Sequence, residues 1–245
     1  MDMAGLLARL LGRKKDQNPV CAAVVAAAGS STRMGGQDKL LLPLGDQPVL
    51  VHTLQALEAC PLITEIVVVT RREHIVPIGQ LCRDCGFQKV TQVIPGGTTR
   101  TESVLSGVRE VGERSELIDI HDGARPLVSQ QVLETVIRRA AQCGAAAPAV
   151  PVKDTIKRAR DGVVVDTLDR TELFAVQTPQ VFQADLIRGA LERALAEGAA
   201  LTDDCSAVER LGIGVALTEG DYKNLKITTP EDLAAAAAFL EQEEW

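Results

Sequence analysis

Residues 21–39 of the chain read CAAVVAAAGSSTRMGGQDK. The run Cys21–Ala28 has only small or apolar side chains, which predicts a strand buried on both faces of a sheet. A loop of small residues, 29–32, comes next, and two cations, Arg33 and Lys39, follow it. Backbone N–H groups in such a loop can approach a phosphate closely, and cations beside it supply positive charge. The stretch therefore predicts the first strand of an α/β protein and a phosphate-binding loop at its carboxyl end.

This loop lacks both of the common phosphate-binding motifs. It has neither the Gly-x-x-x-x-Gly-Lys-Ser/Thr pattern of a P-loop nor the Gly-x-Gly-x-x-Gly pattern of a dinucleotide-binding fold. By itself it is equally compatible with a flexible strand-to-helix turn that carries two solvated cations. The other segments of the sequence distinguish between these two interpretations.

Beyond the loop, short runs rich in Val and Ile alternate with longer segments of helical periodicity. This alternation is typical of a three-layer, Rossmann-like α/β fold, in which helices cover a mostly parallel sheet. We expect strands at 21–28, 66–70, 90–94, 117–121, 145–150 and 213–217, and helices at 48–59, 73–85, 99–111, 129–142, 184–198, 203–211 and 230–241. No internal repeat or linker-like tract divides the chain. The prediction is therefore one domain over residues 20–245, behind an extension of residues 1–19 that is disordered or a short helix.

The alternation breaks at about residues 151–176. There, a polar segment and an alternating segment flank the turn sequence Asp161-Gly162, which predicts a β-hairpin arm that protrudes from the sheet. A hairpin without a core of its own is marginally stable, so we expect it to pack on a partner subunit. The alternative is a solvent-exposed flap.

The composition excludes several classes of protein. The 245 residues include 26 Lys and Arg against 33 Asp and Glu, which gives a formal charge of −7. A protein that coats DNA or RNA needs a cationic surface, and an aromatic content of 2% leaves few stacking platforms for single strands. No apolar run approaches the roughly 20 residues that span a bilayer. We therefore expect no nucleic-acid partner and no membrane span.

Six cysteines are scattered through the chain, and no secretory leader precedes them. Reduced thiols and a cytoplasmic location are therefore expected. Cys82 and Cys85 form a C-x-x-C pair, but no second Cys or His pair stands nearby to complete a zinc site. We therefore interpret Cys82 and Cys85 as two residues of one helix without a metal-binding role.

Three further clusters of small and polar residues fall at predicted strand ends. They are 96–100 with Ser103, 121–126, and 220–229 with Lys226. In α/β proteins, ligands bind at the carboxyl edge of the sheet, where such segments meet. Their convergence with the loop after the first strand favours a phosphate-binding site over a solvated turn.

Together these segments resemble the cytidylyltransferases that add CMP to a sugar-alcohol phosphate, and most closely the 2-C-methyl-D-erythritol 4-phosphate cytidylyltransferase family of the non-mevalonate isoprenoid pathway. The resemblance runs from Cys21 to about Leu240. The matching motifs are Ala27-Ala28-Gly29 with Arg33-Met34 and Lys39, Gly96-Gly97 with Arg100 and Ser103-Val104, Asp122–Pro126, Asp154-Thr155 with Lys157, Asp169-Arg170, Gln177-Thr178-Pro179-Gln180 with Phe182, Thr202-Asp203, and Asn224-Leu225-Lys226.

The resemblance implies a nucleotidyltransferase fold and a reaction in which the substrate phosphate attacks the α-phosphorus of CTP and pyrophosphate leaves. The attacking phosphate has a second pKa of about 6, so it is already an anion and needs no general base. Cations that bring two anions together then carry the catalysis. His121 beside Asp122 looks like a base and its orienter, but this mechanism needs neither, so we expect His121 to be a packed residue. The resemblance also implies Mg²⁺ held mainly by the triphosphate, with no protein metal ligands.

By resemblance, the catalytic cations are Arg33, Lys39, Arg170 and Lys226, and Lys39 lies nearest the α-phosphate. The nucleotide side is expected to comprise Ala27, Ala28, Gly29, Ser30, Gly97, Thr98, Ser103, Asp122 and Gly123. The polyol-phosphate side is expected to comprise Asp122, Arg125, Thr155, Arg170, Thr178, Thr202 and Lys226. Arg170 and Thr155 would come from the arm of the other subunit, so that catalysis would require a homodimer.

Two other functions stay open at this point. A ribitol 5-phosphate cytidylyltransferase shares the chemistry and differs in the alcohol, although residues 168–170 and 202–204 look more like the methylerythritol enzymes. An inactive nucleotide-binding regulator would keep the fold without turnover. Single residues also have structural explanations, such as a surface ion pair for Arg125 or Arg170 and a turn for Asp122.

The chain departs from the family pattern at a few positions. Asp38-Lys39-Leu40 stands where relatives often have Pro-Lys-Gln, and Gly123 stands where Ala is usual. Lys223 replaces a frequent Asp, and Thr98 replaces a commonly acidic residue. None of these departures removes a cation that the mechanism uses.

Overall fold

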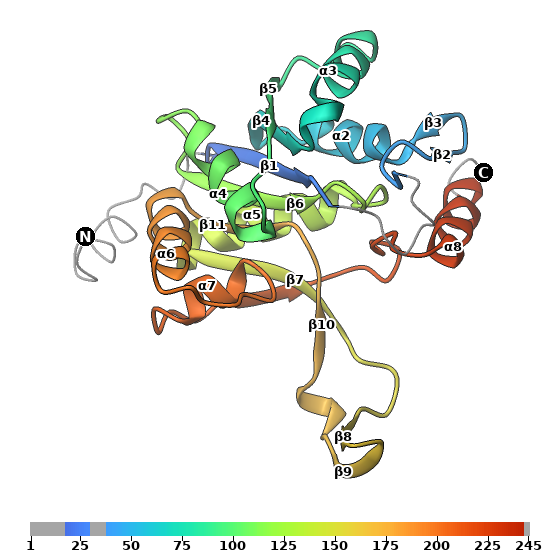
Figure 1. Cartoon of the computed structure of the whole chain (residues 1–245), viewed down its shortest axis with the longest axis vertical. Helices are drawn as coiled ribbons and strands as arrows, with labels where there is room; N and C mark the ends of the chain where they lie inside the picture. Colours follow the sequence, from blue (N-terminus) through green and yellow to red (C-terminus); the bar gives the residue numbers. More distant parts are fainter. Residues whose placement is uncertain (1–17, 30–37, 243–245) are drawn as a thin grey trace.

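The computed structural model of the chain describes residues 18–29 and 38–242. Ser30, Arg33 and most of the expected N-terminal extension lie outside the described residues. The main strands are β1 (Cys21–Ala27), β4 (Ile63–Thr70), β5 (Val90–Pro95), β6 (Leu117–Asp122), β7 (Ala145–Pro151), β10 (Phe174–Val176), β11 (Gln180–Gln183) and β12 (Ala216–Glu219). They form one eight-stranded sheet of order β10-β7-β11-β6-β1-β4-β5, in which β12 also pairs with β7 (Figure 1).

Strand β1 lies in the middle of this sheet and pairs in parallel with both β4 and β6. Its side chains are buried on both faces, apart from the half-buried Ala26, as expected for a strand without charged residues. The parallel register brings Ala27 beside Thr70 and Ala26 beside Asp122. The carboxyl ends of β1, β4 and β6 therefore meet at one edge of the sheet.

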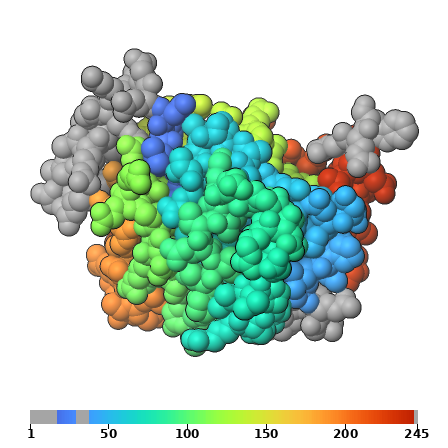
Figure 2. Space-filling model, turned by 90° about the horizontal axis from the view of Figure 1, so that it is seen from above, coloured from blue at the N-terminus to red at the C-terminus, as the bar shows by residue number. Residues whose placement is uncertain are grey.

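Helices cover both faces of the sheet. One face carries α2 (Val49–Ala59), α3 (Ile75–Asp84), α5 (Gln130–Cys143) and α8 (Pro230–Glu241), and the other carries α4 (Arg100–Glu110), α6 (Ala184–Ala196) and α7 (Cys205–Glu209). In the view from above, the blue-to-green segments from α2 to α4 occupy the middle of the visible surface (Figure 2). The two faces bury separate apolar cores, so the expected three-layer α/β fold with a mostly parallel sheet is confirmed. No helix in the described part of the chain is long and apolar enough to cross a bilayer.

The two antiparallel strands of the sheet are not predicted by the sequence pattern. Strand β11 runs antiparallel to both β6 and β7, and β10 runs antiparallel to β7. Four residues with Gln at each end are too few to show either alternation or a long apolar run. Burial of β11 between two longer strands is a long-range effect that the local sequence does not carry.

Two predicted elements near the C-terminus are shorter or shifted. The helix expected at 203–211 is α7, and the strand expected at 213–217 is β12, which begins three residues later. The side-chain oxygen of Gln180 accepts hydrogen bonds from the backbone N–H groups of Asp204 and Cys205, both at 3.0 Å. A buried partner from β11 thus fixes the start of α7, and its effect could not be read from the helix sequence.

The expected arm is present as the hairpin β8 (Lys157–Arg160) and β9 (Val163–Thr167), which projects away from the sheet (Figure 1). Its turn places Asp161 and Gly162 at φ values of 50° and 78°, a region that suits Gly and tolerates Asp. Val163, Val164 and Val165 on β9 are 67%, 55% and 55% exposed. Packing of this apolar strand against a partner subunit stays a prediction.

Asp119, in the middle of β6, carries a buried carboxyl group. Its side chain is fully buried, and neither oxygen has a hydrogen-bond partner among the described residues. Burial raises the pKa of Asp119 well above its usual value. A group whose folded-state pKa is raised contributes stability that is present below the unfolded pKa, about 3.9, and is lost as the pH rises towards the folded pKa.

We therefore expect Asp119→Leu to raise the free energy of unfolding at pH 8 by about 1–3 kcal/mol, the usual penalty of an unsatisfied buried polar group. The gain should shrink at pH 5, because the wild-type carboxyl is then closer to its neutral form in both states. Urea unfolding at the two pH values measures both effects. Asp119→Asn is the control, since an amide cannot ionise and should remove the pH dependence alone. Equal pH dependence in wild type and Asp119→Asn would contradict this account.

Candidate active site

A hollow of about 320 Å³ lies at the carboxyl edge of the sheet, where β1 and β6 end. Eight of the residues proposed from the sequence line it: Ala28, Gly29, Lys39, Gly97, Thr98, Ser103, Asp122 and Lys226. They come from the ends of β1 and β6, the turn before β2 (Pro43–Leu44) that carries Lys39, the start of α4 with the residues just before it, and the segment before α8. The structure therefore gathers the four sequence clusters at one place.

Asp122, the last residue of β6, is the electrostatic centre of the hollow. Its carboxylate lies 2.9 Å from Lys226 Nζ, 3.5 Å from Arg125 Nε and 3.9 Å from Arg100 Nη2. Burial alone would raise the pKa of Asp122, but the charges of Lys226, Arg100 and Arg125 outweigh it and lower the pKa to about 2. Asp122 is therefore ionised at neutral pH and is too weak a base to accept a proton from a substrate.

The start of α4 forms one wall of the hollow. Thr99 and Glu102 form a capping box, in which each side chain accepts a hydrogen bond from the backbone of the other residue. Ser103 Oγ donates to the Thr99 carbonyl at 2.8 Å and accepts from the Gly97 N–H at 3.1 Å. A Cβ on Gly97 would lie 2.5 Å from the Cβ of Glu102, so only glycine fits there. This local network holds the Gly97-Thr98 backbone against the hollow.

Lys39, which follows the phosphate loop in the sequence, also lines the hollow. Its Nζ donates to the carbonyl oxygen of Ile227 at 2.6 Å. This bond ties the residue after the phosphate loop to the segment that carries Lys226. Two proposed catalytic cations, Lys39 and Lys226, thus line the same hollow.

Behind the hollow, buried polar groups hold Asp122 and the Lys226 segment in place. The backbone N–H of Asp122 donates to Thr178 Oγ1 at 3.0 Å, and Arg125 Nη1 donates to the Asn224 carbonyl at 2.6 Å. Asn224 Nδ2 donates in turn to the Thr178 carbonyl at 2.9 Å. Thr178 and Arg125 are both buried, so in this arrangement they support the site from behind. Ala27 and Gly123 are likewise buried beside it rather than on its surface.

Three other proposed residues are exposed and do not line the hollow. Arg170 and Thr155 are exposed on the arm, where Arg170 Nη1 donates to the Lys153 carbonyl at 3.0 Å. Thr202 is exposed before α7. The arm extends away from the sheet of its own chain (Figure 1). Arg33 and Ser30 fall outside the described residues.

His121 is the packed residue that the sequence analysis expects. Its ring is fully buried, and burial lowers the pKa of His121 to about 4. The ring is therefore neutral at physiological pH. In the described ranges 18–29 and 38–242, no three His, Cys, Asp or Glu side chains are grouped so that they could hold a metal ion.

Sequence reasoning missed the part played by Arg100. Its guanidinium makes a bidentate contact with the buried Asp204, at 2.8 and 2.6 Å, and so links the start of α4 to the start of α7. The side-chain oxygen of Gln180 accepts a hydrogen bond from the backbone N–H of the same Asp204. Arg100 and Gln180 stand inside motifs quoted above, which was the available signal, but no pattern connects them to Asp204.

We expect Arg100→Met to lower the free energy of unfolding by about 2 kcal/mol, because Asp204 is left buried without its cation. This value is below the usual 3–5 kcal/mol for a broken buried pair, since the Arg100 side chain is 38% exposed. Arg109→Met is the matched control, because it breaks an exposed pair with Glu192 between neighbouring helices. Its effect should stay within about 0.5 kcal/mol. If urea unfolding gives the same loss of free energy for both substitutions, the Arg100–Asp204 pair contributes no more than an exposed ion pair.

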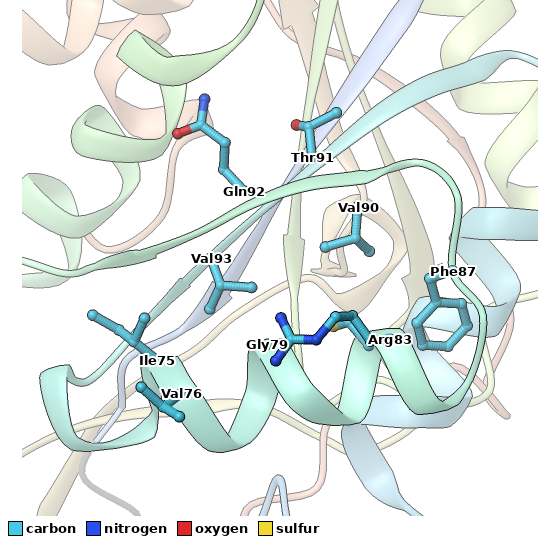
Figure 3. Close-up of a pocket in the computed structure, with 10 residues that line it drawn as sticks. Ile75, Val76, Gly79, Arg83, Phe87, Val90, Thr91, Gln92 and Val93 are labelled. Atoms are coloured by element: carbon cyan, nitrogen blue, oxygen red, sulfur yellow. The ribbon is translucent and has the colours of Figure 1, made fainter.

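A second hollow, of about 360 Å³, lies between α3 and the edge strand β5 (Figure 3). Val90, Val93 and Phe87 line it together with the side chain of Arg83 (Figure 3). It contains none of the residues proposed from the sequence. The hollow around Asp122 is therefore the better candidate for an active site.

The chain is similar in sequence to known enzymes. Residues 21–242 match the profile of the family described as IspD: 2-C-methyl-D-erythritol 4-phosphate cytidylyltransferase. A protein of that name from Desulforamulus reducens is 46% identical over 228 residues, which cover 90% of this chain and 95% of that protein. A protein of the same name from Caldanaerobacter subterraneus subsp. tengcongensis is 45% identical over 225 residues, which cover 89% of this chain and 97% of that protein.

Solved structures show the same similarity. The crystal structure of 4-diphosphocytidyl-2C-methyl-D-erythritol synthase from Anaerococcus prevotii superposes with a TM-score of 0.82 at 31% identity, covering 92% of this chain and all of that one. The 2-C-methyl-D-erythritol 4-phosphate cytidylyltransferase from Thermus thermophilus gives a TM-score of 0.76 at 32% identity, with 89% and 98% of the two chains covered. Both sequence and fold agree over nearly the whole length.

Proposed function

The chain belongs to the 2-C-methyl-D-erythritol 4-phosphate cytidylyltransferase family, and from this premise we propose how the hollow around Asp122 works. The enzyme transfers CMP from CTP to 2-C-methyl-D-erythritol 4-phosphate in isoprenoid precursor biosynthesis. An oxygen of the methylerythritol phosphate attacks the α-phosphorus of CTP, the α–β phosphoanhydride bond breaks, and pyrophosphate leaves. The single observation that carries the assignment of this site is the meeting of Lys39, Lys226 and Asp122 at the end of β1 and β6.

Cations perform the catalysis in this proposal. The attacking phosphate is an anion at neutral pH, so the barrier lies in bringing it to the triphosphate and in the charge of the transition state. Lys39 binds beside the α-phosphate, and Arg33 assists it from the loop after β1. Lys226 and Arg170 bind the methylerythritol phosphate, and Arg125 supports this side through Asp122 and the Asn224 carbonyl.

Asp122 acts as a fixed anion rather than as a base. Its pKa of about 2 keeps it charged, and its 2.9 Å contact orients the Lys226 ammonium before any substrate binds. The nucleotide side consists of Ala28, Gly29, Gly97, Thr98 and Ser103, whose small side chains leave the backbone accessible. Ala27, Gly123, Ser30, Thr178, Thr155 and Thr202 complete the proposed site.

We propose that Mg²⁺ takes part, bound chiefly to the triphosphate oxygens of CTP. Mg²⁺ prefers oxygen ligands and is often bound by substrate phosphates in nucleotide enzymes. The lysines that line the hollow are suited to a phosphate-rich ligand. When bound, the ion would neutralise part of the charge that develops on pyrophosphate.

A homodimer completes the proposal, because Arg170 and Thr155 lie on an arm that leads away from their own chain's hollow. The arm of one subunit would bring them to the hollow of the other, and its exposed valines would pack on that subunit. One domain over residues 20–245 and a cytoplasmic location stay predictions.

Release of pyrophosphate by the purified protein tests the substrate. We expect release with Mg²⁺, CTP and methylerythritol phosphate, and little with ribitol 5-phosphate or with ATP, GTP or UTP. Turnover of ribitol 5-phosphate alone would reverse the choice of polyol. CTP binding without pyrophosphate release from any pair would show an inactive nucleotide-binding protein.

A further inference from the structure

Tyr222 lies at the junction between the arm and the segment that carries Lys226. Its side chain is 45% exposed, yet both its ring and its hydroxyl are engaged. The ammonium of Lys153 lies 3.5 Å from the centre of the ring, and the hydroxyl donates to the Pro151 carbonyl at 2.8 Å. Pro151 is the last residue of β7, where the chain leaves the sheet for the arm.

The same lysine also contacts Arg170. Arg170 Nη1 donates to the Lys153 carbonyl at 3.0 Å, so the backbone of Lys153 holds the guanidinium while its side chain covers Tyr222. The ring and the hydroxyl of Tyr222 therefore hold Lys153 and Pro151, the two residues at the base of the arm.

The backbone segment that contains Tyr222 is also connected to the active site. The neighbouring Asp221 has its carbonyl bound to Gln177 Nε2 at 2.7 Å. Two residues after Tyr222, the carbonyl of Asn224 accepts from Arg125. The next residue but one is Lys226, which contacts Asp122. Tyr222 is thus part of a short, well-anchored segment whose far end is in the hollow.

We propose that Tyr222 is a positioning residue for the polyol phosphate. It fixes the base of the arm, and through Lys153 the guanidinium of Arg170, relative to the segment that presents Lys226. The inference rests on the proposed roles of Arg170 and Lys226 and adds a residue that contacts neither substrate. In the proposed dimer, each latch of Tyr222 and Lys153 sets the direction of the arm that serves the other subunit's hollow.

Tyr222→Leu removes the ring and the hydroxyl together. We expect the KM for methylerythritol phosphate to rise about three- to tenfold, the range of one to two weak contacts of this kind. The KM for CTP should stay within about twofold, because the ring and hydroxyl of Tyr222 contact Lys153 and Pro151, neither of which lines the hollow. Tyr222→Phe keeps the ring under Lys153 and should recover most of the affinity. Leu217→Ala, which truncates a comparably exposed side chain (47%) on β12, should change neither KM.

Lys153→Met provides an independent variant, because it removes the cation and keeps the length of the side chain. It should raise the same KM, and the double variant with Tyr222→Leu should be no worse than the more affected single variant. Additive effects of the two substitutions would overturn the latch. Equal rises in both KM values with a lowered melting temperature would also overturn it, since they indicate a general loss of structure.

Arg170→Ala, assayed in parallel, separates this inference from the site assignment. If Arg170→Ala raises the KM for methylerythritol phosphate and Tyr222→Leu does not, the latch is wrong and the role of Arg170 stands. If neither substitution raises it, the role of Arg170 fails and the latch fails with it. A rise in both, with the CTP value unchanged, supports the latch.

Discussion

Lys39→Ala should lower kcat by about a hundredfold or more, the usual loss for one oriented group that stabilises transition-state charge. Lys39 lines the hollow, and its bond to the Ile227 carbonyl at 2.6 Å places the ammonium beside the segment that carries Lys226. A contact made mainly in the transition state changes kcat more than the KM for CTP. Pyrophosphate release under saturating substrates measures this loss, and CTP titration measures the KM.

The chain offers a matched control for this substitution. Lys89 Nζ donates to the Cys60 carbonyl at 2.7 Å, which is the same kind of contact, and neither Lys89 nor Cys60 lines the hollow. Lys89→Ala should therefore leave kcat within about twofold, although it loses a similar hydrogen bond. If Lys39→Ala is no worse than Lys89→Ala, Lys39 has only a structural role and the proposed mechanism is wrong.

Mixing two impaired variants should restore activity if the site is shared between subunits, when methylerythritol phosphate is kept well below the raised KM of Arg170→Ala. Lys39→Ala damages the hollow of its own chain, whereas Arg170→Ala damages the site that its arm enters. A hybrid dimer then contains one site with both defects and one intact site. With random exchange half of the dimers are hybrids, so at this low substrate concentration we expect about a quarter of wild-type activity from two poorly active proteins.

A second mixture tests the geometry behind this result. Lys39 and Lys226 line the same hollow, so hybrids of Lys39→Ala with Lys226→Ala contain no intact site. This mixture should stay inactive. Subunit exchange is followed with two affinity tags of different length. Exchange without recovery in the first mixture, or equal recovery in both, would rule out the arm as a donor to the partner's site.

The sequence predicts the central part of this fold well because the signals there are local. The apolar run of β1 and the strands and helices that follow it each carry their own periodicity, and parallel pairing then brings their ends together. Asp122, Lys39, Gly97 and Lys226 could be grouped without coordinates, because each stands at a strand end or in a segment that connects a strand to the next element.

Other features depend on partners that are distant in the sequence. Strand β11 is buried only because β6 and β7 flank it, and the Arg100–Asp204 pair joins residues that are 104 positions apart. The sequence also does not distinguish a residue on the surface of the hollow from one behind it. Thr178 and Arg125 hold up Asp122 and the Lys226 segment by hydrogen bonds that no spacing rule encodes.

The charge around Asp122 has a consequence for a cell whose interior turns acidic. Asp122, with a pKa of about 2, and His121, with a pKa of about 4, both keep their charge state between pH 5 and 8. The attacking phosphate does not, because its second pKa is about 6. Activity in mild acid should therefore fall as the substrate gains a proton and becomes a weaker nucleophile. In this sense, the metabolite rather than the protein would act as the pH sensor of the reaction.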